Sequence, residues 1–382
     1  MRIMRWKILI LMFLVAGLVS MAVLVGGGWY VADILRNDGL LPDHEQPKLD
    51  MVVAGIGEGK VTLNVTSDTS TDGPWMRRGI WGLKSADGYD QVGAILEISD
   101  QHVVREYLPL KGTLETGETV HVESTAFPDD PQEAFGFTFQ NVTFSSPLGD
   151  FDAWFIDGSS NTWVIFVHGR ASNRNEALRI LPTIVESGLP FLIITYRNDE
   201  GAPADPDGYY RYGQTEWEDL EGAVAYSIAH GAEDLILVGY SMGGSIVTNF
   251  LYQSPLAKRV RGLILDAPMI NFNTTVDLGA NERSLPGPFV DLAKFIAKVR
   301  FGVDWGELDY LARATELSPP ILLFHGDADD IVPVETSDAL AKARPDIVEY
   351  VRVPGAPHVG SWNIDRVRYE TAVSNFLRDL TR

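Results

Sequence analysis

The chain has 382 residues, 45% of them hydrophobic and 22% charged, and its formal net charge at pH 7 is −21. This length and composition are typical of a globular protein with a large core and room for a second module, and the negative charge argues against binding of nucleic acid or anionic lipid by the folded part. The chain contains no cysteine, which excludes disulfides and a bacterial lipoprotein anchor.

The chain begins with an uncharged apolar stretch. Residues Ile8 to Ala32, about 25 in number, carry no charge and could cross roughly 30 Å of hydrocarbon as a helix. The basic residues before this stretch are Arg2, Arg5 and Lys7. The positive-inside rule then places the N-terminus in the cytoplasm and the rest of the chain outside. We predict a single-pass, uncleaved anchor in the cell membrane with an extracytoplasmic body.

A cleaved signal peptide is the alternative interpretation of this stretch. Ser20 to Ala22 would form a small-x-small cleavage site, and cleavage there would give a secreted protein. The apolar run continues past that site from Val23 to Val31, which favours the anchor. The predicted first unit, residues 1–36, is therefore a cytoplasmic tip and a transmembrane helix.

Residues 37–134 are expected to form a small β-rich module. Short runs of β-type residues, such as Lys60 to Thr66 and Ala94 to Ile98, alternate with turn clusters such as Ser67 to Gly73. Three aromatic residues of this region could line a ligand groove or form the core of the module: Trp75, Trp81 and Tyr89. The sequence assigns no role to the module.

From residue 135 to residue 382, apolar strands and helices with an apolar stripe alternate. This alternation predicts an α/β fold with a mostly parallel sheet covered by helices on both faces. The strand expected at Thr162 to Val167 leads into His168, Gly169 and Arg170. Within this region, the segment 269–318 is longer than a simple crossover requires, and helices are expected near Phe289 to Arg300 and Gly306 to Thr315.

A second strand, within Asp234 to Gly244, runs directly into the motif Gly239-Tyr240-Ser241-Met242-Gly243. This pattern is typical of a nucleophile elbow, in which glycines on both sides of a serine allow a tight strand-to-helix turn. The backbone N–H of Met242 would be unpaired at the helix N-terminus and could stabilise an oxyanion. An ordinary glycine-rich turn is the alternative, but the apolar residues before and after the motif favour the elbow.

A serine hydroxyl is a weak nucleophile, so this interpretation requires a base and an orienting acid. The expected strand at Ile321 opens into a loop with three carboxylates, Asp327, Asp329 and Asp330. The expected strand at Val348 ends in a Gly/Pro turn that presents His358. The chain order serine, aspartate, histidine is the one expected of α/β-hydrolases.

With these motifs the chain resembles the α/β-hydrolase superfamily, and within it the esterase, dienelactone-hydrolase and prolyl-oligopeptidase-like branches. Those branches carry a His-Gly-x-x-Asp-x-x-Val-Pro segment, which is matched here by His325, Gly326, Asp329, Val332 and Pro333. The resemblance covers about the last two thirds of the chain and implies the α/β-hydrolase fold. It also makes segment 269–318 a candidate helical lid, whose apolar face would either shape an acyl pocket or belong to the core.

The resemblance further implies a role for individual residues. Asp329 would be the catalytic acid, with Asp330 as a rival, and His358 would be the base. The second oxyanion donor would be the backbone N–H of Arg170, or that of Ala171. The two other histidines of these motifs, His168 and His325, are expected to brace loops.

We therefore predict a serine hydrolase that cleaves a carboxylic ester of a small molecule through an acyl-enzyme. The alternatives are a serine peptidase, an acyltransferase, or a catalytically silent hydrolase fold used as an interaction module. The carboxylate clusters match no EF-hand pattern and the chain has no His-Glu-x-x-His motif, so no metal and no cofactor are expected. Acyl chain length, leaving group, protein partner and oligomeric state do not follow from the sequence.

Overall fold

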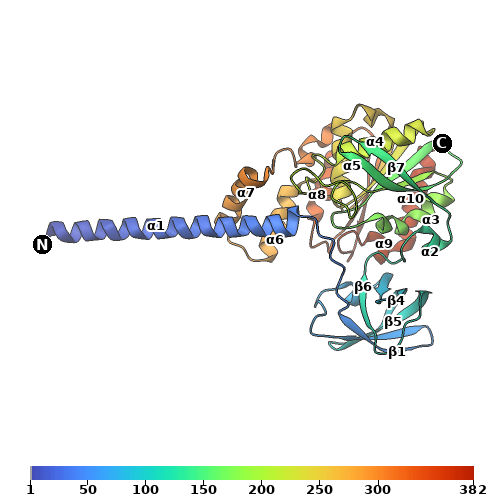
Figure 1. Ribbon diagram of the computed structural model, residues 1–382, viewed down its shortest axis with the longest axis horizontal. Helices are drawn as coiled ribbons and strands as arrows, with labels where there is room; N and C mark the ends of the chain where they lie inside the picture. Colours follow the sequence, from blue (N-terminus) through green and yellow to red (C-terminus); the bar gives the residue numbers. More distant parts are fainter. Residues whose placement is uncertain (1) are drawn as a thin grey trace.

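The computed structural model of the protein describes residues 2–382, apart from the side chains of residues 2–5 and 8. It contains a long N-terminal helix, a small β-barrel and a larger body built on a second sheet (Figure 1). The side chains of Arg2, Arg5 and Ile8, which enter the prediction of the membrane span and its orientation, lie outside the described residues.

The first helix, α1, runs from Arg2 to Ile34 and continues into a short π-helical segment, Leu35–Leu40. It projects from the body as a single long rod (Figure 1), and apolar side chains along it, such as Phe13 and Leu18, are exposed. Within Leu9–Leu40, a window of 18 residues has a mean hydropathy of 2.7, and the helix is long and apolar enough to cross a membrane. A signal sequence passes the same test, so length and composition alone do not separate the two predicted alternatives.

Six antiparallel strands follow and close into a barrel in the order β1-β2-β5-β4-β3-β6. They are β1 (Met51–Gly57), β2 (Lys60–Val65), β3 (Trp81–Lys84), β4 (Tyr89–Ile98), β5 (His102–Lys111) and β6 (Thr119–Glu123). The predicted β-rich module is confirmed. Trp75 and Trp81 are buried in its core, and the buried Tyr89 donates a hydrogen bond from its hydroxyl to Glu123 at 2.8 Å. These aromatic residues therefore fill the module and do not line an open groove.

The body is built on an eight-stranded sheet with the order β14-β13-β12-β11-β9-β10-β8-β7. Its strands are β7 (Gln140–Ser146), β8 (Gly149–Ile156), β9 (Thr162–Val167), β10 (Phe191–Ile194), β11 (Asp234–Tyr240), β12 (Val260–Asp266), β13 (Ile321–Gly326) and β14 (Val348–Val353). The six strands from β9 to β14 are parallel to one another, while β8 and β7 pair antiparallel. The predicted mostly parallel sheet is confirmed.

Helices cover both faces of this sheet. They are α2 (Pro131–Phe135), α3 (Leu181–Glu186), α4 (Trp217–Ala229), α5 (Met242–Gln253), α8 (Val334–Ala343), α9 (Ser361–Ile364) and α10 (Arg366–Leu380). Successive strand side chains point to opposite faces, so Ile165 packs in the cluster with α4, α5 and α8, while Phe166 packs with α3 and α10. The parallel strands all present their carboxyl ends at one edge, where the loops after β9, β11, β13 and β14 converge.

Two further helices, α6 (Phe272–Glu282) and α7 (Gly287–Phe301), lie beside the base of α1 (Figure 1). The sequence predicted α7 but not α6, because α6 is rich in Asn, Thr and Gly, which are weak helix formers. It begins at an Asn271 cap, whose side chain accepts from the backbone N–H of Thr274. The helix predicted near Gly306 to Thr315 is instead a 3-10 segment, Tyr310–Glu316.

Candidate active site

Ser241 stands on a strained turn between β11 and α5. Its φ of 50° and ψ of −118° lie in a region that non-glycine residues rarely occupy, and such strain is often found at functional sites. A Cβ atom on Gly239 would come within 2.6 Å of the carbonyl oxygen of Gly243, and a Cβ on Gly243 would overlap the carbonyl oxygen of Val167. The two motif glycines are therefore required by space, and the sequence pattern forms the predicted elbow.

Three predicted site residues meet at the carboxyl edge of the sheet. The Ser241 Oγ atom lies 2.8 Å from Nε2 of His358, and Nδ1 of His358 lies 2.8 Å from Oδ2 of Asp329. They follow β11, β14 and β13, which are separated in the sequence but end at the same edge. The hydroxyl, imidazole and carboxylate thus form one continuous hydrogen-bonded line.

The Asp329 carboxylate is fully buried and held by several donors. Its Oδ1 atom accepts from the backbone N–H groups of Ile331 (2.9 Å) and Val332 (2.8 Å), and its Oδ2 atom also lies 3.1 Å from Nε2 of His325. Burial by itself would raise the pKa of Asp329, but His358 and His325 outweigh it and hold the pKa well below its usual range. The rival carboxylate, Asp330, is exposed and lies at the pocket.

The pKa of the His358 imidazole is shifted in the opposite direction to that of Asp329. Burial would lower its pKa, but the nearby Asp329 carboxylate outweighs burial, so the pKa of His358 is raised above its usual value. When the ring is neutral, a proton on Nδ1 bonds to Asp329 and leaves Nε2 as an acceptor for the Ser241 hydroxyl. This tautomer is the one that a general base next to serine requires.

A further carboxylate, Asp266 at the end of β12, lies behind the serine. It is buried, its Oδ1 atom accepts from the Ser361 hydroxyl at 2.8 Å, and its backbone oxygen accepts from the N–H of Ser241 at 3.0 Å. Burial raises the pKa of Asp266 to about 6, although the hydrogen bond from Ser361 opposes the shift. The sequence offered no motif that singles out this residue.

The loop after β9 passes directly beside the serine, since a Cβ atom on Gly169 would lie 3.1 Å from Cβ of Ser241. Arg170 lines the same cavity as Ser241. Neither the backbone N–H of Arg170 nor that of Met242 donates a hydrogen bond to another residue in the part of the chain that the structure describes. Over the same residues, both N–H groups therefore have no hydrogen-bond partner near Ser241, as their predicted role as oxyanion donors requires.

Buried polar groups hold the loop after β9 in place. The His168 ring lies between the Asp199 carboxylate (Nε2, 2.9 Å) and the carbonyl oxygen of Gly169 (Nδ1, 2.8 Å). Burial would lower the pKa of His168, but Asp199 outweighs it and raises the pKa, which suits a ring that faces an acceptor at each nitrogen. The Glu176 carboxylate accepts from the N–H of Gly169 at 2.8 Å. His168 was predicted as a brace, whereas Glu176 was not anticipated.

His325 also has a bracing geometry. Its Nδ1 atom lies 2.7 Å from the Ser337 hydroxyl, and its Nε2 atom faces both Asp329 and the carbonyl oxygen of Val332, each at 3.1 Å. Both partners of Nε2 are acceptors, so Nε2 carries a proton. The ring thus fixes the acid loop and does not contact Ser241.

The loop that carries the site histidine is tied to the β-barrel. Buried Arg179 donates to the carbonyl oxygen of Val359 (2.6 Å) and to the side-chain oxygen of Asn363 (2.8 Å). The Asn363 side-chain amide donates in turn to two barrel carbonyls, those of Ile80 (2.8 Å) and Ser124 (2.9 Å). No sequence pattern predicts this chain of contacts, because its members are far apart in the sequence and none belongs to a motif.

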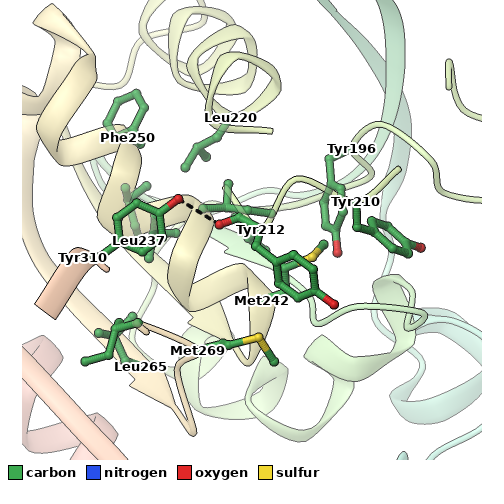
Figure 2. Close-up of a cluster of buried hydrophobic side chains, with 14 of the residues drawn as sticks. Tyr196, Tyr210, Tyr212, Leu220, Leu237, Met242, Phe250, Leu265, Met269 and Tyr310 are labelled. Atoms are coloured by element: carbon green, nitrogen blue, oxygen red, sulfur yellow. Dashed lines mark hydrogen bonds between the residues drawn. The ribbon is translucent and has the colours of Figure 1, made fainter. Parts of the chain in front are cut away.

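A cavity of about 420 Å³ opens at Ser241 and His358. Its walls are mainly apolar and come from Met269, from α6 and α7, and from the last turns of α1. Figure 2 shows Met242 and Met269 in one buried cluster with Tyr212, whose backbone oxygen accepts from the Tyr310 hydroxyl at 2.9 Å.

Over the described residues, no group of three or more His, Asp or Glu side chains is arranged to hold a metal ion.

Residues 164–371 match the model of the Alpha/beta hydrolase family, and the chain belongs to that family. The fold predicted from the motifs is thereby confirmed. The chain is 22% identical over 275 residues to the uncharacterized protein YfhR of Salmonella typhimurium, covering 64% of this chain and 83% of YfhR. It is 26% identical over 226 residues to the uncharacterized protein YqkD of Bacillus subtilis, covering 57% of this chain and 71% of YqkD.

Among solved structures, the esterase Pf2001 of Pyrococcus furiosus has the same fold. It superposes with a TM-score of 0.54 at 21% sequence identity and covers 67% of this chain and 98% of the esterase.

Proposed function

We propose that the protein is a membrane-anchored serine hydrolase that cleaves a carboxylic ester through an acyl-enzyme. The observation that carries the proposal is the line of two 2.8 Å contacts from Ser241 through His358 to Asp329. His358 takes the proton of the Ser241 hydroxyl as Oγ attacks the ester carbonyl. It then gives that proton to the departing alcohol, and a water molecule that it activates releases the acid.

The remaining residues support the charges that form during this reaction. Asp329 holds the imidazole in the required tautomer and stabilises the imidazolium. The backbone N–H groups of Met242 and Arg170 would donate to the oxyanion, a contribution of about 3 kcal/mol per donor in comparable sites. Because these donors and the residues that brace them are already ordered, little reorganisation is needed during the reaction.

The cavity favours an ester over a peptide. Its walls are mainly apolar, and helices α1, α6 and α7 line it. An extended peptide would need an open groove with backbone partners, whereas a volume of about 420 Å³ suits a single small molecule or an acyl group. The similar fold of the esterase Pf2001 agrees with this preference.

We also propose that α1 is an uncleaved anchor. The signal-peptide site expected at Ser20 to Ala22 lies inside the continuous helix Arg2–Ile34, and exposed apolar side chains continue beyond it, including Val23 and Val25. N-terminal sequencing of the protein from membranes tests this proposal. A mature start at Val23 would contradict it, whereas an intact N-terminus that stays with membranes through alkaline carbonate washes supports it.

The enzymatic proposal is tested by labelling with a fluorophosphonate probe, which reacts with activated serines. We expect Ser241 to be labelled, and Ser241→Ala to lose both labelling and ester hydrolysis, with a rate loss of at least about 10⁴-fold. A panel of p-nitrophenyl esters and p-nitroanilide amides then separates an esterase from a peptidase. A silent interaction module would show neither labelling nor turnover.

A further inference from the structure

The end of α1 forms one wall of the cavity at Ser241. Val31, Ile34 and Leu35 line that cavity together with the serine, and Val31 and the neighbouring Ala32 are buried. The following segment is fixed to the body by hydrogen bonds to three backbone oxygens. These are Tyr212 Oη to Gly39 (2.6 Å), the Tyr210 N–H to Leu40 (2.8 Å) and Arg170 Nη2 to Leu41 (3.1 Å). The same helix therefore serves as the candidate anchor and as part of the substrate site.

Helix α7 packs tightly against α1 just before this wall. A Cβ atom on Gly27 would come within 2.5 Å of the Phe289 ring, and one on Gly28 within 2.7 Å of Leu292. Farther along both helices, Arg300 pairs with Asp33 at 2.8 Å and its guanidinium lies 3.9 Å from the centre of the Trp29 ring. The small glycines thus let α7 approach the α1 backbone, and the contact continues to the first charged residue after the apolar stretch.

The position of the cavity relative to a bilayer follows from two exposed aromatic residues. Trp29 and Tyr30 lie at the end of the uncharged stretch and are 47% and 67% exposed. Such aromatic residues mark the membrane–water interface of transmembrane helices. With a helical rise of about 1.5 Å per residue, Ile34 lies only about 6–8 Å along the axis beyond this pair. The α1 wall of the cavity is therefore within one to two helical turns of the interface.

Helix α7 extends the apolar surface around α1. Phe295 and Val299 are 64% and 69% exposed. At about 100° per residue, they lie on the flank of the stripe that contacts α1, on the side opposite to the body-facing Val290 and Ala297. Exposed apolar side chains that continue the surface of a membrane helix are what a lipid bilayer would cover.

The charged groups at the cavity do not favour an anionic ligand. Those that line it are three basic and three acidic residues, Arg170, Arg283 and Lys294 with Asp38, Glu282 and Asp330. Arg283 is paired with Asp38 at 3.1 Å, and Lys294 is paired with Asp277. Since the whole chain carries a net charge of −21, an anionic head group would also approach against the overall field.

We propose that the substrate is a neutral lipid ester whose acyl chain passes from the bilayer directly into the cavity, between the end of α1 and helix α6, which both line the cavity. Helix α1 is then part of the acyl-binding site and not only an anchor. The inference rests on the proposed function, because it names the substrate class of the same serine. It adds that the substrate is taken from the membrane and not from water.

The test compares two substrates that share one leaving group. The full chain is reconstituted in phosphatidylcholine vesicles and given p-nitrophenyl acetate from solution or p-nitrophenyl palmitate within the vesicles. Ile34→Trp fills the α1 wall, and we expect the palmitate-to-acetate rate ratio to fall about tenfold, because the larger side chain takes the space of a long acyl chain but not that of an acetyl group. Val23→Trp, at an exposed position of α1 away from the cavity, is the matched control and keeps the wild-type ratio.

A second pair of variants tests the membrane-facing side of α7 without touching the cavity. We expect Val299→Asp to lower the same ratio several-fold, because a charge at this position opposes contact with the bilayer. Val367→Asp, which changes a similarly exposed valine on α10, leaves the ratio unchanged.

The possible failures are distinguishable. If the wild-type protein hydrolyses the acetate but not the palmitate, or if Ile34→Trp and Val299→Asp both keep the wild-type ratio, entry from the membrane is wrong and the esterase proposal stands. If the wild-type protein hydrolyses neither ester and Ser241 is not labelled, the proposed function itself fails, and the lipid substrate fails with it.

Discussion

Ser241 and His358, with Asp329 buried behind the histidine, occupy one side of the cavity, and residues 31–39 with helices α6 and α7 line the other. The first side is the edge of a parallel sheet, where backbone hydrogen bonds between neighbouring strands fix the positions of the loops. The second side is held by side-chain packing, hydrogen bonds and an ion pair between segments at distant places in the sequence. If the proposed function is correct, the sheet edge determines the reaction and the packed wall determines the substrate.

The largest expected effect concerns the sheet edge. Asp329→Asn keeps the shape of the acid but favours the wrong imidazole tautomer, so we expect kcat to fall by about 10⁴-fold, as in the serine-protease precedent. Asp330→Asn is the matched control and should change kcat little, because this side chain is exposed and does not contact His358. Steady-state kinetics with a soluble ester measures both. A larger loss from Asp330→Asn would assign the acid to that residue.

The next effect concerns the packed wall. A chain that begins at Pro42 lacks the buried side chains of Val31 and Leu40, whereas a chain that begins at Tyr30 keeps them. At about 1.5–3 kcal/mol for each buried aliphatic side chain, the shorter chain should be less stable by roughly 3–6 kcal/mol. Urea unfolding of the two proteins measures the difference. Equal midpoints would show that residues 31–41 do not contribute to the folded body.

A smaller effect is expected from the buried carboxylate behind the serine. The folded pKa of Asp266 is about 6, above the ordinary value of 3.8, so its ionised form is disfavoured in the folded protein. This penalty, about 3 kcal/mol at most, applies above pH 6 and disappears as the pH falls below the ordinary value. Asp266→Asn should therefore raise the unfolding midpoint at pH 8 and give no gain near pH 3.5. A gain that is the same at both pH values would rule out this titration as the cause.

The smallest effect is a shift of the pH profile. His358 must be neutral to act as a base, and its pKa is raised above the ordinary 6.5 by the Asp329 carboxylate against the opposing effect of burial. We therefore expect kcat/KM for a soluble ester to rise with pH and to level off through an inflection above 6.5. Asp266→Asn removes a second negative charge that favours the imidazolium, so its inflection should lie below that of the wild type. An inflection below 6.5 in the wild type would contradict this account.

The contrast between the sheet edge and the packed wall also explains which features could be predicted from the sequence. The elbow around Ser241 was predictable because its glycines are required by local space. Asp329 could be placed because it lies in the His-Gly-x-x-Asp-x-x-Val-Pro segment, and His358 because it lies in a Gly/Pro turn after a predicted strand. Sequence patterns of this kind report local backbone geometry. The strands of the large sheet were predictable for the same reason, since each is a short apolar run bounded by turn residues.

The wall was not predictable, because it depends on contacts between distant segments. Nothing in the local pattern shows that Val31 and Ile34 line a cavity together with Ser241, since an apolar membrane helix has the same composition on every side. Glu176 and Arg179 were missed as well, because a single charged residue in a helix usually faces solvent. Helix α6 was missed because its Asn, Thr and Gly residues have low helix propensity and tertiary packing overrides that preference.

The Asn363 side chain has a consequence for how the molecule can be divided. Its amide nitrogen donates to two carbonyls of the barrel, and its oxygen accepts from Arg179, which also holds the loop after His358. A fragment made of residues 135–382 alone would lose both hydrogen bonds of this amide to the barrel, each a net contribution of about 0.5–1.5 kcal/mol. The barrel therefore supports the loop after His358 through Asn363. The boundary predicted near residue 134 does not separate two domains that are each complete without the other.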